Sequence, residues 1–313
     1  MASRFLLSID GGGIRGILPV CALMKLEQTT GRLARETFSF AAGTSTGAIL
    51  SAAIAAGIPA TRLLDLYLNR GVEIFSPRPP WNTIKRAARG FMYSIDTLHS
   101  IIEEEFGAAA AWKINDSPID LLLTAKGLDG KPWYFVKDKP ANSRATGEFG
   151  LVDCATASAA APTYFDPWKC SGAAGMGPLV DGGVGVTGNP VYQACVEAFC
   201  YTGEYAPDTT TVVSLGTGRF KAASGEPSTL WGWLEWVLAE LLQAPEEQQT
   251  EIAQRQFPQM RFFRFDADIA QIDPTLEKPI DMDDVGSMDK LVAYGHAFAA
   301  SIDWRAVLEG DPT

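Results

Sequence analysis

Residues 43–47 carry the clearest pattern for covalent chemistry, because they read Gly-x-Ser-x-Gly. An apolar, strand-prone run precedes them, and a helix-prone run follows at 48–56. A strand, a tight turn and a helix in this order form a nucleophile elbow, which presents a serine hydroxyl at the end of the strand. The pattern therefore predicts Ser45 as a nucleophile, with Gly43 and Gly47 leaving room for the tight turn.

A second glycine-rich stretch follows the apolar run 4–9. Residues 10–16 read Asp-Gly-Gly-Gly-Ile-Arg-Gly and precede an amphipathic run at about 18–27. Successive glycines let backbone N–H groups converge where the oxyanion of a tetrahedral intermediate forms. The start of the following helix adds positive potential there. We expect this loop to bind a transient anion, with Arg15 adding a charge or locking the loop.

The same loop also fits Gly-x-Gly-x-x-Gly, so a nucleotide-binding module is an alternative from another functional class. That fold requires an acidic residue about 20 positions further on, at the end of the second strand. Glu36 has the spacing but precedes the second expected strand. Asp10 would also place a carboxylate beside a bound pyrophosphate. Both residues favour a catalytic interpretation of the loop.

The base that activates Ser45 has candidates of two kinds. A Ser-His-Asp triad needs a histidine, and the chain has only His99 and His296. His296 fits the chain order Ser, Asp, His of α/β-hydrolases, whereas His99 lies in an expected surface helix beside glutamates. Asp181 is the other candidate, because the two glycines that follow it leave its carboxylate unobstructed.

Together these motifs resemble those of the patatin-like phospholipases. The order and context match at five stretches, namely 10–16, 43–47, 159–165, 181–183 and 214–218. The similarity covers most of residues 4–220. The resemblance implies a three-layer α/β/α domain with a mostly parallel central sheet. It also implies a lipid acyl hydrolase of the phospholipase A type that needs neither a metal nor another cofactor.

The resemblance also implies a role for each site residue. Ser45 is the nucleophile and Asp181 the base of a Ser-Asp dyad. The oxyanion hole consists of Gly11, Gly12, Gly13 and Arg15. An acyl-enzyme forms on Ser45 and is then hydrolysed by water. A carboxylesterase with a triad through His296, the nucleotide-binding module, and a hydrolase switched on by a signalling nucleotide remain as alternatives.

The periodicity of the chain predicts the elements that must position these residues. Strand and helix alternate over the first 56 residues, which indicates a parallel sheet covered by helices. Further strands are expected at 120–124, 132–136, 211–215 and 261–265, the first two forming a hairpin. Further helices are expected at 61–69, 95–106, 151–161 and near the C-terminus through His296.

Length and charge limit the possible classes of function. The 313 residues are expected to form a single domain, with a motif-bearing core at about 4–220 and an extension at about 225–313. Hydrophobic residues make up 47% and charged residues 20%, as in globular proteins. The net charge of −11 disfavours nucleic acid as a partner and electrostatic adsorption to anionic membranes.

Cysteine usage and hydropathy predict a cytoplasmic protein. The odd number of cysteines and their apolar surroundings indicate buried free thiols in a reducing compartment. These cysteines are Cys21, Cys154, Cys170, Cys195 and Cys200. The N-terminal apolar run is too short for a signal peptide, and no run of 18 apolar residues spans a membrane.

Two segments are candidates for transient contact with a membrane surface. Residues 229–242 contain three tryptophans within six positions, a composition that suits a lid, a membrane-facing helix or a buried core helix. The basic residues Lys85, Arg86 and Arg89, which lie among aromatic residues, form the second candidate. The resemblance to the patatin-like phospholipases implies a phospholipid or another acyl-ester lipid as the substrate.

Overall fold

The fold is taken from a computed structural model, which describes most of the chain. The described residues are 4–76, 91–142, 144–172, 176–219, 233, 247–276 and 279–309. The basic residues Lys85, Arg86 and Arg89 lie outside these ranges, as does the segment 229–242 apart from Trp233. Within the described ranges, no helix is both long enough and apolar enough to cross a membrane.

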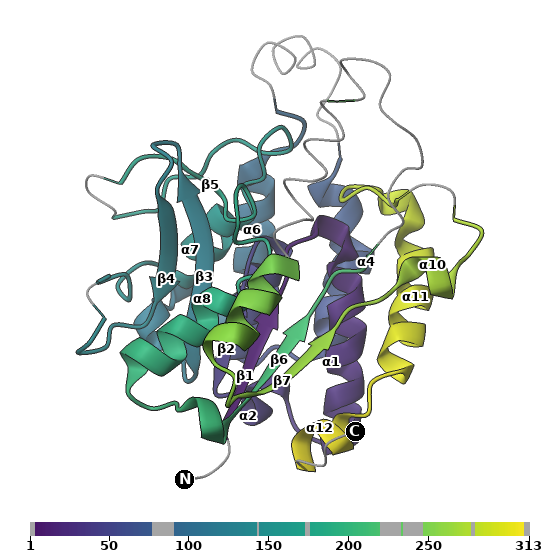
Figure 1. The fold of residues 1–313 in the computed structure, drawn as a ribbon. Helices are drawn as coiled ribbons and strands as arrows, with labels where there is room; N and C mark the ends of the chain where they lie inside the picture. Colours follow the sequence, from purple (N-terminus) through teal and green to yellow (C-terminus); the bar gives the residue numbers. More distant parts are fainter. Residues whose placement is uncertain are drawn as a thin grey trace.

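A seven-stranded sheet forms the centre of the described structure (Figure 1). Its strands are β1 (Arg4–Ile9), β2 (Phe40–Gly43), β3 (Asp120–Gly127), β4 (Pro132–Val136), β5 (Leu179–Asp181), β6 (Thr210–Leu215) and β7 (Arg261–Phe265). Six strands lie in the order β4-β3-β2-β1-β6-β7, and β5 pairs with β3. The neighbouring strands in the row β3-β2-β1-β6-β7 run parallel to one another, whereas β4 and β5 run antiparallel to β3. The expected hairpin is confirmed as the β3–β4 pair.

Helices cover both faces of this sheet (Figure 1). They are α1 (Ile17–Thr30), α2 (Ala34–Thr37), α3 (Thr46–Ala56), α4 (Ala60–Ile74), α6 (Ile95–Phe106), α7 (Leu151–Ser158), α8 (Val191–Val196), α10 (Ile269–Ile272), α11 (Met288–Ala300) and α12 (Trp304–Glu309). The larger core lies between the sheet and α1, α3, α4, α6, α7 and α11. The smaller core lies against α8. The expected layered fold, with a mostly parallel sheet between helices, is confirmed.

Alternate residues of the central strands face the two helical layers. On β1, Leu7 and Ile9 belong to the larger core and Leu6 to the smaller one. On β6, Val213 and Val212 divide in the same way. Successive side chains of a strand point to opposite faces, so a strand covered on both faces needs apolar residues throughout. This requirement explains why these strands contain apolar residues at consecutive positions, such as Leu6-Leu7 and Val212-Val213.

The cysteines follow the expectation with one exception. Four of them are buried free thiols, but Cys200 is exposed. Cys200 lies in a short π-helical segment at 197–202, which continues α8. Ala198 packs into the smaller core, and the residue two positions further along a helix points away from that core. The position of Cys200 on the helix therefore turns its thiol towards solvent.

Candidate active site

Ser45 lies in the turn that joins β2 to α3. Its backbone angles are φ 56° and ψ −126°, a conformation that residues with a side chain rarely adopt. The two flanking glycines make this turn possible. A Cβ atom on Gly43 would lie 2.0 Å from the carbonyl oxygen of Gly47, and one on Gly47 would lie 2.3 Å from that of Ile9. The turn thus has the geometry of a nucleophile elbow.

A serine from α7 holds the backbone of this turn. The Ser45 N–H donates a hydrogen bond of 2.9 Å to Oγ of Ser158, whose side chain is completely buried. The sequence reveals the dense small residues of α7, which let the helix approach the elbow closely. It does not distinguish Ser158 from the other small residues of that helix, so this contact is missed without the tertiary structure.

We expect the substitution Ser158→Ala to destabilise the elbow. It leaves the partly buried Ser45 N–H without its partner, and an unsatisfied donor of this kind costs about 1–3 kcal/mol. The free energy of unfolding measured in urea should fall by this amount. Ser158→Thr, which keeps the hydroxyl, serves as the matched comparison. Equal stability of Ser158→Ala and the unmodified protein would show that the hydrogen bond contributes nothing.

The register of β5 brings Asp181 next to the elbow. β2 pairs with β3 only as far as Gly43, which lies opposite Leu123. β5 then pairs with the next part of β3, where Asp181 lies opposite Ala125. Asp181 therefore takes a position beside β3 just beyond the end of β2. Ser45 leaves the sheet at the same point, so the two side chains meet.

The end of α7 also fixes β5. The helix ends at Ser158, three residues before the expected end at position 161. The chain turns there, and the carbonyl oxygen of Ala160 accepts a 3.0 Å hydrogen bond from the N–H of Asp181. If α7 continued, the Ala160 carbonyl oxygen would accept a hydrogen bond within the helix. It accepts one from β5 instead, which explains why α7 is shorter than expected.

Asp181 is buried and lies next to the serine. Its carboxylate accepts a 2.7 Å hydrogen bond from the Gly183 N–H. Burial raises the pKa of Asp181 to about 6, although the Ser45 side chain and the Gly183 N–H both lower it. A carboxylate with a raised pKa is a stronger base than an exposed one. The pair can therefore act as a nucleophile and its base.

The glycine loop lies directly beside Ser45. A Cβ atom on Gly11 would be 3.2 Å from the Cβ atom of Ser45. The Gly11 N–H is already used, since it donates a 2.9 Å hydrogen bond to the carbonyl oxygen of Gly188. Among the described residues, the N–H groups of Gly12 and Gly13 have no recorded partner. These two groups are available to an oxyanion, whereas that of Gly11 is not.

Arg15 contacts the loop that precedes it. Its Nε donates a 3.3 Å hydrogen bond to the carbonyl oxygen of Gly12, and its backbone N–H donates to the same oxygen at 3.1 Å. These bonds fix the orientation of the peptide between Gly12 and Gly13. They agree with the role of locking the loop that the sequence suggested for Arg15.

The alternative residues lie elsewhere. His99 is hydrogen bonded to Thr156 at 3.0 Å and stacked on Trp168, so it is less exposed than the expected surface helix implies. His296 is exposed on α11, the opposite face of which packs on α1. Glu36 accepts a 2.8 Å hydrogen bond from the Leu33 N–H at the start of α2. It therefore caps a helix and does not follow the second strand.

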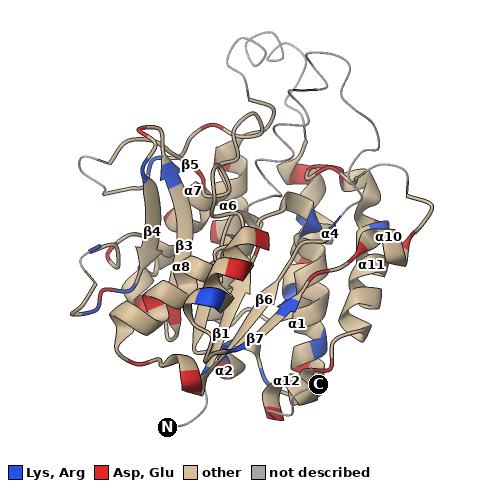
Figure 2. Cartoon of the chain, viewed as in Figure 1, with Lys and Arg blue, Asp and Glu red and all other residues tan. Residues whose placement is uncertain are grey.

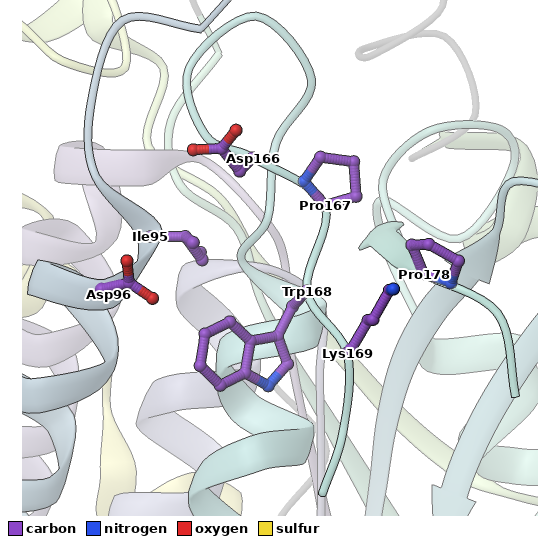
Figure 3. Close-up of a pocket in the computed structure, with 7 residues that line it drawn as sticks. All are labelled: Ile95, Asp96, Asp166, Pro167, Trp168, Lys169 and Pro178. Atoms are coloured by element: carbon purple, nitrogen blue, oxygen red, sulfur yellow. The ribbon is translucent and has the colours of Figure 1, made fainter. Parts of the chain in front are cut away.

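A surface pocket of about 430 Å³ lies beside the start of α6 (Figure 3). Its lining residues are Ile95, Asp96, Asp166, Pro167, Trp168, Lys169 and Pro178. None of the residues predicted to do chemistry belongs to this lining. Among the described residues, no group of three or more His, Cys, Asp or Glu side chains is arranged to hold a metal ion.

Comparison with known protein families gives a match over residues 7–194, to the model described as patatin-like phospholipase. The match contains the glycine loop, Ser45 and Asp181. It ends before β6 and β7.

Individual relatives give the same family at moderate identity. The chain is 30% identical over 201 residues to a cGAMP-activated phospholipase of Escherichia coli (strain TW11681), covering 62% of this chain and 55% of the relative. It is 29% identical over 238 residues to the mouse (Mus musculus) calcium-independent phospholipase A2-gamma, and this match covers 72% of this chain and 30% of the relative. The chain thus spans at most about half the length of these relatives.

Among solved structures, VipD from Legionella pneumophila matches with a TM-score of 0.46 at 11% identity, covering 99% of this chain and 67% of VipD. Human GIVD cytosolic phospholipase A2 matches with a TM-score of 0.39 at 13% identity, covering 98% and 60%.

Proposed function

Because this chain belongs to the patatin-like phospholipase family, we propose that it hydrolyses carboxylic esters of membrane lipids through a Ser45–Asp181 dyad. The observation that carries the proposal is the approach of the strained elbow serine to the buried Asp181, which the strand register sets beside the elbow and whose pKa the serine side chain lowers. The relatives' names, which describe phospholipases, support a lipid as the substrate. The glycine loop supports acyl transfer as the chemistry, because Gly11 lies next to Ser45 and the following N–H groups of Gly12 and Gly13 have no acceptor among the described residues.

The first half of the reaction transfers the acyl group to the enzyme. Asp181 accepts the hydroxyl proton as Oγ of Ser45 attacks the ester carbonyl carbon. The C=O bond becomes a C–O⁻ single bond, and the N–H groups of Gly12 and Gly13 bind this oxyanion. The tetrahedral intermediate then breaks its bond to the alcohol oxygen. Asp181 returns the proton to that oxygen, and the alcohol part of the lipid leaves.

The second half releases the fatty acid. Asp181 takes a proton from a water molecule, which attacks the acyl carbon on Ser45. The Ser45 oxygen leaves, accepts the proton and restores the dyad. A lone carboxylate is too weak a base to ionise serine beforehand, so proton transfer accompanies attack. Each oxyanion donor then contributes on the order of 3 kcal/mol to the transition state, which makes the glycine loop as important as the dyad.

The pKa of Asp181 predicts how the rate depends on pH. The base must be ionised to accept a proton, and its pKa in the folded protein is about 6. We expect kcat/KM to fall tenfold for each pH unit well below this value and to level off above it. A pH profile of kcat/KM with a soluble ester tests this. A profile that stays flat down to pH 4 would contradict an Asp181 base.

Contact with a membrane surface is part of the proposal, since the substrate resides there. α4 carries Leu68 and Val72 one turn apart, and their side chains are 37% and 53% exposed. Exposed apolar side chains of this kind can enter the interface of a bilayer. We place the protein in the cytoplasm with peripheral membrane contact, and we propose that its 313 residues act as a single acyl hydrolase domain.

The proposed function is tested by product analysis. The protein is incubated with vesicles of a mixed phospholipid extract, and the released fatty acids and lysophospholipids are identified by mass spectrometry. We expect both products from the unmodified protein and neither from Ser45→Ala. The assay is repeated with cGAMP, because one relative is named for activation by it. If the unmodified protein releases no fatty acid under either condition, the proposed function is wrong.

A further inference from the structure

β7 brings a positive charge into the sheet beside the active site. The neighbouring β6 and the strand β2 contain no charged residue, whereas β7 contains Arg261 and Arg264 (Figure 2). The guanidinium of Arg264 reaches across β6 and donates a 2.6 Å hydrogen bond to Oδ2 of Asp10. It also donates to Oγ of Ser214 at 2.9 Å. Arg264 thereby connects β7 to the residue that precedes the glycine loop.

Asp10 is completely buried where β1 leads into this loop. Its Oδ1 has no hydrogen-bond partner among the described residues, so the ion pair with Arg264 is the main compensation for its charge. The Asp10 N–H donates a 3.0 Å hydrogen bond to the Leu215 carbonyl oxygen at the end of β6. A buried charge that loses its partner is strongly unfavourable, so Asp10 must move or take up a proton when Arg264 is removed.

Other residues from the same part of the chain hold the loop further along. Oγ1 of Thr217 donates a 2.7 Å hydrogen bond to the Gly11 carbonyl oxygen. The carbonyl oxygen of Met282 accepts a 2.8 Å hydrogen bond from the Ile14 N–H. A Cβ atom on Gly12 would lie 2.3 Å from Oγ1 of Thr217, so the loop is packed closely against these supports. Thr217 and Met282, like Arg264, lie beyond the family match, which ends at residue 194.

We propose that Arg264 is a positioning residue for the oxyanion loop: by holding Asp10, it keeps the N–H groups of Gly12 and Gly13 directed at the acyl carbonyl next to Ser45. The inference rests on the proposed function. Arg264 does not contact the substrate and acts through Asp10. A shift of about 1 Å in a positioned group is enough to lower a rate about 100-fold.

The ion pair has an electrostatic role as well. A bare carboxylate at Asp10 would repel the oxyanion, because Gly11 connects it directly to the loop beside Ser45. The charged groups that face Asp10 are Arg264 and Asp266, and Asp266 is itself 3.3 Å from Arg264. Arg264 therefore forms ion pairs with both carboxylates, and Arg219, 3.8 Å from Asp266, adds a second positive charge. Burial raises the pKa of Asp10 to about 6 even with the attraction of Arg264.

The test compares three substitutions with the unmodified protein. We expect Arg264→Met to lower kcat about 100-fold with KM nearly unchanged, because the loop acts on the transition state. Asp10→Asn combined with Arg264→Met removes both charges and should recover about tenfold of that loss. Arg264→Lys keeps a charge but cannot bind Asp10 and Ser214 together. Its kcat should lie between that of Arg264→Met and that of the unmodified protein. The rate at which a fluorophosphonate labels Ser45 should follow the same order.

Arg261→Met is the matched control, since Arg261 lies on the same strand but bonds to the Ala306 carbonyl oxygen and not to the loop. Its kcat should stay within twofold of the unmodified value. Folding of each variant is checked by circular dichroism. If Arg264→Met does not fold, the protein that combines Arg264→Lys with Asp10→Asn replaces it in the comparison. A folded Arg264→Met with unchanged kcat, or a loss confined to KM, would overturn the inference. Absence of activity in the unmodified protein would instead overturn the proposed function.

Discussion

Substitution of Ser45 by alanine should lower the hydrolysis of phospholipid vesicles at least about 10⁴-fold, since it removes the only oxygen that the proposed mechanism can acylate. The folded state should persist, because alanine keeps the Cβ atom and the N–H that donates to Ser158. Loss of the strained serine at φ 56° relieves no conformational cost, as alanine disfavours that region equally. Fatty acid release and labelling by a fluorophosphonate should both disappear.

Ser51→Ala is the matched control for this substitution. Ser51 lies on the same helix, α3, is completely buried, and its hydroxyl has no partner among the described residues. Its removal should leave activity unchanged and stability equal or higher by up to about 1 kcal/mol. Hydrolysis by Ser45→Ala at more than about a tenth of the unmodified rate would exclude Ser45 as the nucleophile.

Substitution of Asp181 by asparagine should lower kcat about 10²- to 10⁴-fold, the contribution expected from a positioned general base. Asparagine has nearly the same shape, so its oxygen can still accept the hydrogen bond from the Gly183 N–H. Its amide cannot take the proton from Ser45. The pH dependence near the Asp181 pKa of about 6 should disappear from the residual activity. Steady-state kinetics with a soluble ester measure both effects.

Asp120→Asn provides the matched control for the base. Asp120 is also a buried carboxylate, but it lies at the opposite end of β3 and is paired with Lys139 at 3.1 Å. The substitution should reduce stability without lowering kcat. Full activity of a folded Asp181→Asn protein together with loss in His296→Ala would replace the dyad with a triad. The exposed position of His296 on α11 makes the opposite result the expected one.

The local elements were predictable because each depends on a short stretch of sequence. The run 4–9 forms β1 at the expected bounds, and 48–56 lies within α3. Glycines that must form tight turns are also visible, since an added Cβ atom at Gly43 would meet backbone at 2.0 Å. These features follow from propensity, alternation and turn chemistry, which act over a few residues.

Contacts between distant segments were not predictable from such patterns. Ser158 is one small residue among many in α7, yet only it accepts from the Ser45 N–H. Gly11 looks equivalent to its neighbours, but its N–H is bound to the Gly188 carbonyl oxygen. Arg264 lies 254 positions from Asp10, its partner in the ion pair. Nothing in the sequence near either residue specifies the other.

By itself the sequence indicated which residues have the chemistry for acyl transfer: a serine in an elbow, an aspartate before two glycines, and a loop of successive glycines. It also determined that strands and helices alternate, because apolar periodicity is a local property. Only the tertiary structure decided that these residues meet. The decisive step is the pairing of β5 with β3 beyond the end of β2, which sets Asp181 beside Ser45. Strand register depends on packing against the whole sheet, so a single stretch of sequence does not specify it.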